Sequence, residues 1–235
     1  MSSHLHSFED ENELTSALSV RIADQLQTAL QTRGTATLAV SGGSTPVPLF
    51  KKLRQISLPW EKVHITLVDE RWVPPDHADS NERLVKMHLL QDRAQKAQWL
   101  SLKSEHSRIE PIVIEALNRK LAPMLPFDAL VLGMGKDGHT ASFFPDAPHP
   151  DLQQALSPAE NQWCMAIASP TSQYPRMTLT LPAILQSQQI YVHIQGDDKK
   201  AVLDRAMADG AIEELPIRAI LRQNSAPVAI YYCPQ

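Results

Sequence analysis

Short apolar segments alternate with amphipathic segments along this chain, and this alternation constrains the fold more than any other feature of the sequence. Leucine and isoleucine recur every four positions within residues 10–33, which predicts an amphipathic helix that Gly34 ends. Strands that alternate with helices are typical of an α/β fold with a largely parallel sheet. The other predicted elements are helices at 46–53, 80–90, 112–121 and 197–208, and strands at 36–40, 63–68, 129–132, 165–168, 177–181, 190–194 and 228–232.

The length and charge of the chain narrow its organisation and its partners. With 235 residues, 43% of them hydrophobic, the chain can build one sizeable core. Internal repeats and Ser/Gly-rich linkers are absent from the sequence, which predicts a single domain over residues 1–235. The net charge of -4, without a long basic run, argues against nucleic acid or an anionic membrane as partner. A small anionic ligand stays possible, because it needs only a few local cations.

Targeting and redox features favour a cytoplasmic location. The N-terminal residues lack the basic and apolar regions of a signal peptide, and no apolar run reaches the length of a membrane span. Two cysteines, Cys164 and Cys233, do not make a disulfide framework and suit a reducing compartment. We expect a monomer or a small homo-oligomer, and the sequence does not distinguish the two.

Glycine is scarce and concentrated. Only 8 of the 235 residues are glycine, and six of these lie at 42–43, 133–138 and 196, each group after a predicted strand. Glycine allows the backbone to approach a ligand closely. Because the carboxyl ends of parallel strands share one edge of a sheet, we expect these loops and the charged loop after residue 68 to border one site.

The first of these loops reads Ser-Gly-Gly-Ser-Thr-Pro at 41–46, between a strand and a helix. Its free backbone N–H groups at Gly42, Gly43, Ser44 and Thr45 predict an anion site, because a helix N-terminus favours negative charge. Thr45 is a suitable N-cap, and Pro46 suits the first helical position. A plain strand-to-helix turn is an equally good interpretation of this loop.

The second loop begins Asp69-Glu70-Arg71 directly after a strand. The planar guanidinium of Arg71 could hold a phosphate or polarise a carbonyl oxygen, and Asp69 lies beside it as a further candidate binding residue. The alternative is a salt-bridged loop in which Ser80 or Asn81 only caps the next helix.

The third loop, Gly-Met-Gly-Lys-Asp-Gly-His-Thr-Ala-Ser at 133–142, contains a dinucleotide-like glycine pattern. Pro145 and Pro148 follow too soon for the long helix that this fingerprint opens, so we predict no cofactor. Histidine titrates near neutrality, and His139 is therefore a candidate general base. Asp137 could orient His139 or cap a following short helix, and the pattern favours the cap. The sequence shows no metal-binding motif, so we predict no metal ligands.

Two further cations belong to the candidate site. Arg176 begins a predicted strand, which must run antiparallel to the others if Arg176 is to reach the same edge. Lys199 lies at a loop-to-helix junction and is a candidate phosphate ligand. Taken singly, each could be a solvated surface residue.

In this order, the five elements resemble the 6-phosphogluconolactonase family, and the resemblance spans nearly the whole chain. The most specific part is the 133–142 segment followed by Phe143-Phe144-Pro145. Small departures from the family pattern are Phe143, Asp146 and Met177.

The resemblance implies a Rossmann-like three-layer α/β sandwich with a mostly parallel sheet and at least one antiparallel strand. It also implies metal-independent hydrolysis of 6-phospho-D-glucono-1,5-lactone in the pentose phosphate pathway. His139 would activate water, while Arg71, Arg176, Lys199 and the 42–45 loop would hold the phosphate and polarise the lactone.

Two alternatives remain at this stage. A glucosamine-6-phosphate deaminase resembles the first two motifs, but its Gly-His continues into a segment with an acidic residue, whereas this chain has Thr-Ala-Ser-Phe-Phe-Pro at 140–145. A non-catalytic sugar-phosphate sensor often carries a DNA-binding segment, and the sequence shows no basic helix-turn-helix.

Overall fold

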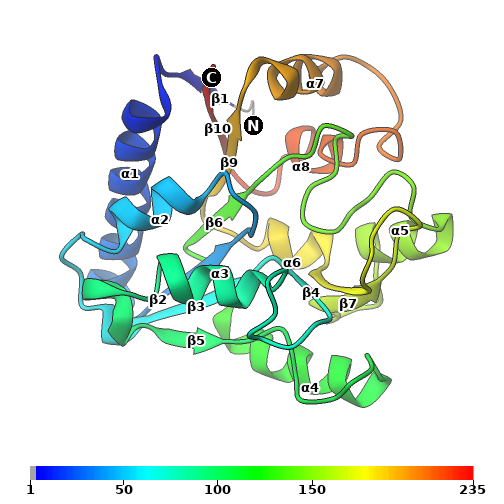
Figure 1. The fold of residues 1–235 in the computed structure, drawn as a ribbon, viewed down its shortest axis with the longest axis horizontal. Coiled ribbons are helices and arrows are strands. Elements are labelled where there is room, and N and C mark those ends of the chain that lie inside the picture. Colours follow the sequence, from blue (N-terminus) through cyan, green and yellow to red (C-terminus); the bar gives the residue numbers. More distant parts are fainter. Residues whose placement is uncertain (1–3, 235) are drawn as a thin grey trace.

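A seven-stranded, fully parallel sheet forms the centre of the computed structural model, which describes residues 4–234 (Figure 1). The strand order is β1-β10-β9-β6-β2-β3-β5, and every neighbouring pair is parallel. The prediction of a single domain stays a prediction, and its residues 1–3 and 235 lie outside the described residues. The strands are β1 (His4–Ser7), β2 (Ala36–Val40), β3 (Val63–Leu67), β5 (Gln98–Leu100), β6 (Ala129–Leu132), β9 (Ile190–Gln195) and β10 (Val228–Cys233).

A second, antiparallel sheet has three strands in the order β4-β8-β7, namely β4 (Asp69–Arg71), β7 (Cys164–Ile167) and β8 (Arg176–Leu179). The predicted antiparallel strand that carries Arg176 is therefore confirmed, but it lies in this separate sheet. The sequence predicts a loop at 69–71, whereas these residues pair with β8 so that Arg71 lies opposite Arg176.

Helices cover both sides of the large sheet: α1 and α2 lie on one side, and α6, α8 and the small sheet on the other (Figure 1). Asp10 caps α1 by accepting a hydrogen bond from the Glu13 backbone N–H, and Gly34 ends it in the left-handed conformation. No helix within residues 4–234 is both long and apolar enough to cross a membrane. The helices are α1 (Glu11–Arg33), α2 (Val47–Leu53), α3 (Asn81–His88), α4 (Pro111–Leu121), α5 (His149–Leu156), α6 (Leu181–Leu185), α7 (Asp197–Met207) and α8 (Arg218–Leu221), with short 3-10 turns at Trp60–Lys62, Asp92–Lys96 and Ala122–Met124.

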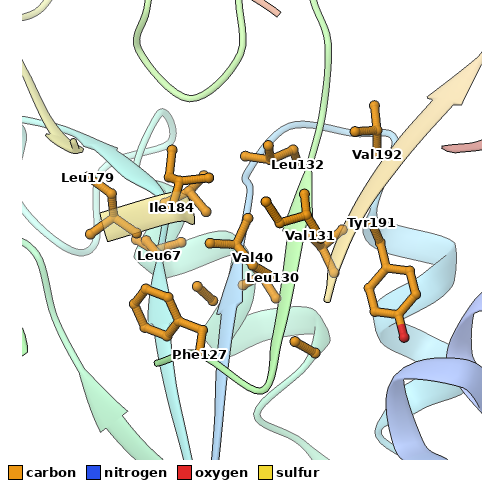
Figure 2. Packing of buried hydrophobic residues seen from close by; sticks show 14 of the residues in the cluster. Val40, Leu67, Phe127, Leu130, Val131, Leu132, Leu179, Ile184, Tyr191 and Val192 are labelled. Atoms are coloured by element: carbon orange, nitrogen blue, oxygen red, sulfur yellow. The ribbon is translucent and has the colours of Figure 1, made fainter. Parts of the chain in front are cut away.

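The core lies on both faces of the central strands (Figure 2). Val40, Leu67 and Leu130 are completely buried, because a parallel strand covered on both faces has no polar side. Each such side chain stabilises the fold by about 1.5–3 kcal/mol relative to an exposed one. This packing fixes the strand ends, and with them the loops that follow.

The order of the strands creates a crevice at one place. From β2 the chain continues to β3 on one side, whereas β6 pairs with the other side of β2. The loops that leave β2 and β6 therefore diverge, and ligands of open α/β sheets bind at the carboxyl ends of strands at such a switch point.

Candidate active site

A cavity of about 320 Å³ opens at this switch point. Its walls come from the loops after β2 and β6, from β4 and the start of β8, and from β9 and α7. Nine of the ten residues that the sequence analysis assigned to the site line this cavity, and the tenth, Asp137, contacts one of them. The nine are Gly42, Gly43, Ser44, Thr45, Asp69, Arg71, His139, Arg176 and Lys199.

Ser41 joins the two loops of the crevice at their bases. Its Oγ donates to the carbonyl of Val131 (2.9 Å) and accepts from the N–H of Gly133 (3.1 Å). The next residue, Gly42, packs so closely on Asn81 that an added Cβ would lie 1.9 Å from Asn81 Oδ1. Glycine at 42 is therefore required for this loop to lie against the α3 start.

The predicted cap of α2 is wrong. The helix begins at Val47, its N-cap residue is Pro46, and no side chain caps it. The Val47 N–H donates to the carbonyl of Ser44 (3.2 Å), so a tight turn places Thr45 before the helix. The Thr45 hydroxyl instead lies 3.5 Å from Lys199 Nζ, in the cavity wall.

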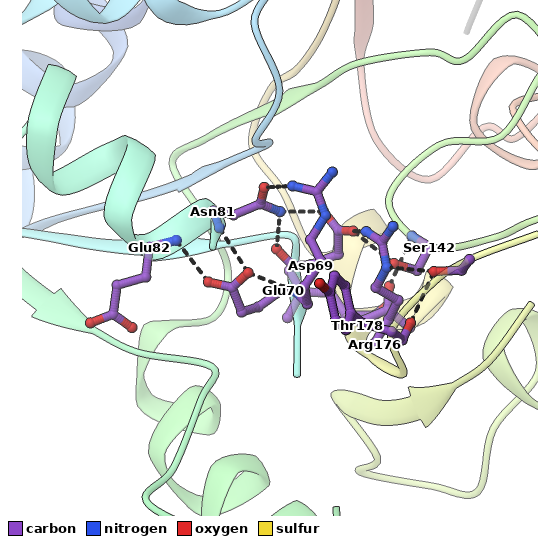
Figure 3. Close-up of polar contacts among 11 residues, drawn as sticks. Asp69, Glu70, Asn81, Glu82, Ser142, Arg176 and Thr178 are labelled. Carbon is purple, nitrogen blue, oxygen red and sulfur yellow. Dashed lines mark hydrogen bonds and ion pairs between the residues drawn. The ribbon is translucent and has the colours of Figure 1, made fainter. Parts of the chain in front are cut away.

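Glu70 anchors the start of α3 (Figure 3). Its buried carboxylate accepts hydrogen bonds from the N–H groups of Arg71, Asn81 and Glu82 (2.7–2.8 Å) and from the Ser80 hydroxyl (3.0 Å). Burial raises the pKa of Glu70 although these four hydrogen bonds act in the opposite direction. Ser80 is the N-cap of α3, as one of the sequence interpretations held.

Asn81 is a site residue that the sequence analysis treated only as a possible cap. Its Nδ2 donates to the Asp69 carbonyl (2.9 Å), and its Oδ1 accepts from an Arg71 Nη1. The residue lines the cavity and is 2% exposed. The sequence around Asn81 indicates this role only weakly, because the orientation of Asn81 depends on the Glu70 carboxylate eleven residues earlier.

Asp69 joins three segments of the same wall (Figure 3). The Ser142 hydroxyl donates to Asp69 Oδ2 (2.7 Å), and Arg176 Nη1 lies 3.5 Å from the same oxygen. Burial lowers the pKa of Arg176, and the charge of Arg71 lowers it further against the opposing effect of Asp69. The Arg176 guanidinium also lies 5.4 Å from the centroid of the Phe144 ring.

His139 and Asp137 form a close pair. His139 Nδ1 lies 2.6 Å from Asp137 Oδ1, which also accepts from the His139 backbone N–H (3.1 Å). A Cβ at Gly135 would lie 2.2 Å from His139 Nδ1 and 2.4 Å from Asp137 Oδ1, so only glycine fits beneath the pair. Burial raises the pKa of Asp137, but the hydrogen bond and charge of His139 outweigh burial and lower it overall.

The capping interpretation of Asp137 is wrong, because no helix follows it before α5 begins at His149. Its ionised carboxylate accepts a hydrogen bond from the Nδ1–H of His139 and thereby selects the tautomer with an unprotonated Nε2. Among residues 4–234, no side chain or backbone group bonds this Nε2. The geometry gives His139 the free nitrogen that a general base needs.

Lys199 lies in the first turn of α7 and lines the cavity. Within the described part of the chain its ammonium has a single hydrogen-bond neighbour, Thr45, and no carboxylate within ion-pair distance. Burial lowers the pKa of Lys199, and the charge of Lys136 lowers it further. An unneutralised cation beside the 42–45 loop is suited to an anionic ligand.

His193 on β9 is a second residue that the sequence analysis did not assign to the site. It lines the cavity and is 2% exposed. An isolated histidine in an apolar strand gives no pattern from which this position could be recognised. Across residues 4–234, moreover, no three His, Cys, Asp or Glu side chains converge as a metal site would require.

The chain is similar to known proteins along its whole length. Residues 9–229 match the family described as glucosamine-6-phosphate isomerases/6-phosphogluconolactonase. The 6-phosphogluconolactonase of Rhizobium meliloti (strain 1021) is 42% identical over 234 residues, which cover 100% of each chain. That of Pseudomonas putida is 37% identical over 230 residues, covering 98% and 93% of the two chains. The crystal structure of a 6-phosphogluconolactonase from Shewanella baltica OS155 superposes with a TM-score of 0.94 at 42% identity, covering 99% and 98%.

Proposed function

Because this chain belongs to the glucosamine-6-phosphate isomerase/6-phosphogluconolactonase family, we propose that it hydrolyses 6-phospho-D-glucono-1,5-lactone to 6-phospho-D-gluconate. This makes it a carboxylic ester hydrolase of the pentose phosphate pathway. One observation carries the proposal: a single cavity is lined by His139, whose imidazole pairs with Asp137, and by an unneutralised lysine beside the 42–45 loop.

The phosphate binds at the end of the cavity formed by the 42–45 loop and Lys199. The backbone N–H groups of this loop and the hydroxyls of Ser44 and Thr45 offer neutral donors, and Lys199 offers a positive charge. Arg71 and Arg176, which lie opposite each other on β4 and β8, add positive charge to the same cavity. Asp69 acts on the substrate through Arg176, whose guanidinium it holds.

His139 acts as the general base. Its Nε2 takes a proton from a water molecule as the water oxygen bonds to C1 of the lactone. Negative charge develops on the carbonyl oxygen, and guanidinium groups of the wall stabilise it. The C1–ring oxygen bond then breaks, His139 returns the proton to the ring oxygen, and the open-chain acid leaves. Asp137 fixes the tautomer and stabilises the imidazolium in between.

The deaminase alternative is not favoured. Between Thr140 and Ala147 the only acidic residue is Asp146, and its carboxylate accepts hydrogen bonds from Ser169 (2.7 Å) and Thr171 (2.6 Å) rather than lining the cavity. The acidic residue that follows Gly-His in the deaminase pattern therefore has no counterpart in this cavity. Ammonia release from glucosamine 6-phosphate would reverse this conclusion.

The test is lactone hydrolysis above the spontaneous rate, with EDTA present, for the wild type and His139→Ala. We expect the wild type to turn over in EDTA and His139→Ala to lose about 10²–10⁴-fold in kcat/KM. His106→Ala is the matched control, because the His106 side chain is exposed and its imidazole lies 3.8 Å from the exposed carboxylate of Glu110. Binding of 6-phosphogluconate without any turnover would indicate a sensor and contradict the proposal.

We also propose a cytoplasmic enzyme without nucleic-acid or membrane partners, active as a monomer or small homo-oligomer. Both cysteines are buried and unpaired, which accords with a reducing compartment. Metal independence stays a prediction, and the EDTA arm of the assay measures it.

A further inference from the structure

The imidazole of His193 is buried and lines the cavity, and within the described residues neither ring nitrogen has a hydrogen-bond partner. A buried polar group without a partner is unfavourable, because it has lost its bonds to water and gained none. Such a group at a cavity wall indicates that a ligand atom completes it. The proposed mechanism does not use His193, so it is free for another role.

The surroundings place His193 at the phosphate end of the cavity. Lys199 is the charged group that affects His193 electrostatically, and Lys199 itself lies beside Thr45. In the sheet, Val192 pairs with Leu132, so the next residue along each strand, His193 and Gly133, are neighbours. Gly133 in turn bonds Ser41 at the root of the 42–45 loop.

His193 is a neutral side chain in this position. Burial lowers its pKa to about 4, and the nearby charge of Lys199 acts in the same direction. A neutral imidazole carries one N–H and one lone pair. Facing a phosphate oxygen, it can offer only the N–H, and Lys199 supplies the charge.

We infer that His193 donates a hydrogen bond from its ring N–H to an oxygen of the substrate phosphate, next to Lys199. This makes His193 a binding residue that distinguishes phosphorylated from unphosphorylated lactones. The inference rests on the proposed function, and it adds a residue and a contact to the phosphate site.

The experiment compares 6-phosphogluconolactone with glucono-1,5-lactone, which lacks the phosphate. We expect His193→Leu to raise KM for the phosphorylated lactone about 10- to 100-fold, the effect of losing one hydrogen bond to a charged group. For glucono-1,5-lactone, kcat/KM should stay unchanged. His193→Asn and His193→Gln place an amide N–H near the positions of Nδ1 and Nε2, so the variant that retains a low KM identifies the donating nitrogen.

The outcomes separate the two proposals. No acceleration of either lactone by the wild type would remove the proposed function and this inference with it. If the wild type is active, an equal loss on both lactones in His193→Leu would show that the imidazole only supports the cavity wall, and no loss on either would show that it is not needed. Either result would overturn the inference and leave the proposed function in place.

Discussion

Two parts of the same cavity differ in how their polar groups are satisfied. The paired wall consists of Asp69, Glu70, Arg71, Asn81 and Arg176, and each side chain has a protein partner. The open end consists of Thr45, His193 and Lys199, where the imidazole lacks a partner and the ammonium lacks a carboxylate among residues 4–234. The first region is organised in the free chain, whereas on the proposal above the second is completed by the substrate.

This difference predicts which substitutions affect folding and which affect binding. Groups with protein partners contribute to the stability of the free enzyme. Groups without partners reduce that stability and contribute only when a ligand is present. Four measurements test the distinction.

The largest expected effect is a loss of unfolding free energy in acid, caused by His193 at the open end. The pKa of His193 is lowered from 6.5 to about 4, so between these pH values the unfolded chain binds a proton that the folded chain does not. The free energy of unfolding therefore falls by about 3 kcal/mol in total as the pH falls from 6.5 toward 4, because the folded chain keeps neutral an imidazole that the unfolded chain protonates. Urea unfolding of wild type and His193→Leu across this range measures it.

Comparison with His193→Leu isolates this group, because the raised pKa of Glu70 favours the folded state in acid and is common to both proteins. Equal slopes of the free energy of unfolding against pH in the two proteins would contradict the prediction.

Glu70→Gln should disrupt the paired wall. The amide retains one acceptor oxygen, but its NH₂ group faces N–H donors of α3, and about 2–3 kcal/mol of unfolding free energy should be lost for the unsatisfied donors. Thermal or urea unfolding measures this loss. Glu61→Gln, on the exposed turn before β3, is the control and should change little. A Glu70→Gln protein of wild-type stability would show that the wall does not depend on its pairing.

Lys199→Met, in contrast to Glu70→Gln, should weaken substrate binding without lowering stability. Removing an unneutralised ammonium leaves the stability unchanged or slightly higher, while KM for the phosphorylated lactone rises about 10- to 100-fold. Lys200→Met is the matched control, because Lys200 pairs with Asp204 (2.6 Å) on the next helical turn. A fall in stability without a change in KM would place Lys199 with the paired groups.

The smallest expected effect is on kcat and concerns the pair of Asp137 and His139, which is neither buried like the paired wall nor unpartnered like the open end. Asp137 has a partner in His139, but its side chain is 48% exposed. Asp137→Asn should lower kcat about ten-fold at nearly constant KM, because the amide no longer stabilises the imidazolium of a partly solvated base. Asp198→Asn, which removes the exposed ion pair with Lys136, should leave kcat unchanged.

A contrast between local pattern and distant pairing explains which parts of the fold the sequence could predict. Strands 36–40 and 129–132 were predicted with their observed bounds, because strands buried on both faces are continuous apolar runs. Strand β4 was missed, because Asp-Glu-Arg has no strand pattern and its structure comes from pairing with β8. The short strands β1 and β5 were also missed, and so were α5, α6 and α8.

For the site, sequence reasoning found the residues that stand at strand ends and missed those whose position depends on distant partners. Asn81 is oriented by Glu70 and Asp69, and His193 reaches the cavity only because β9 lies beside β6. The error at Thr45 has a similar origin, since a capping residue was inferred from type alone and the turn at Ser44 was not foreseen.

The Ser41 hydroxyl has a consequence for the size of substrate that the enzyme can use. Because it bonds both the carbonyl of Val131 and the N–H of Gly133, the loop for phosphate and the loop that carries His139 are fixed to adjacent strands at one point. The bases of the two loops are therefore held one strand spacing apart, about 4.8 Å. On the proposed function, we expect the enzyme to favour one number of carbons between phosphorus and the carbonyl, so a five-carbon phosphorylated lactone should be hydrolysed with a lower kcat/KM than the six-carbon substrate.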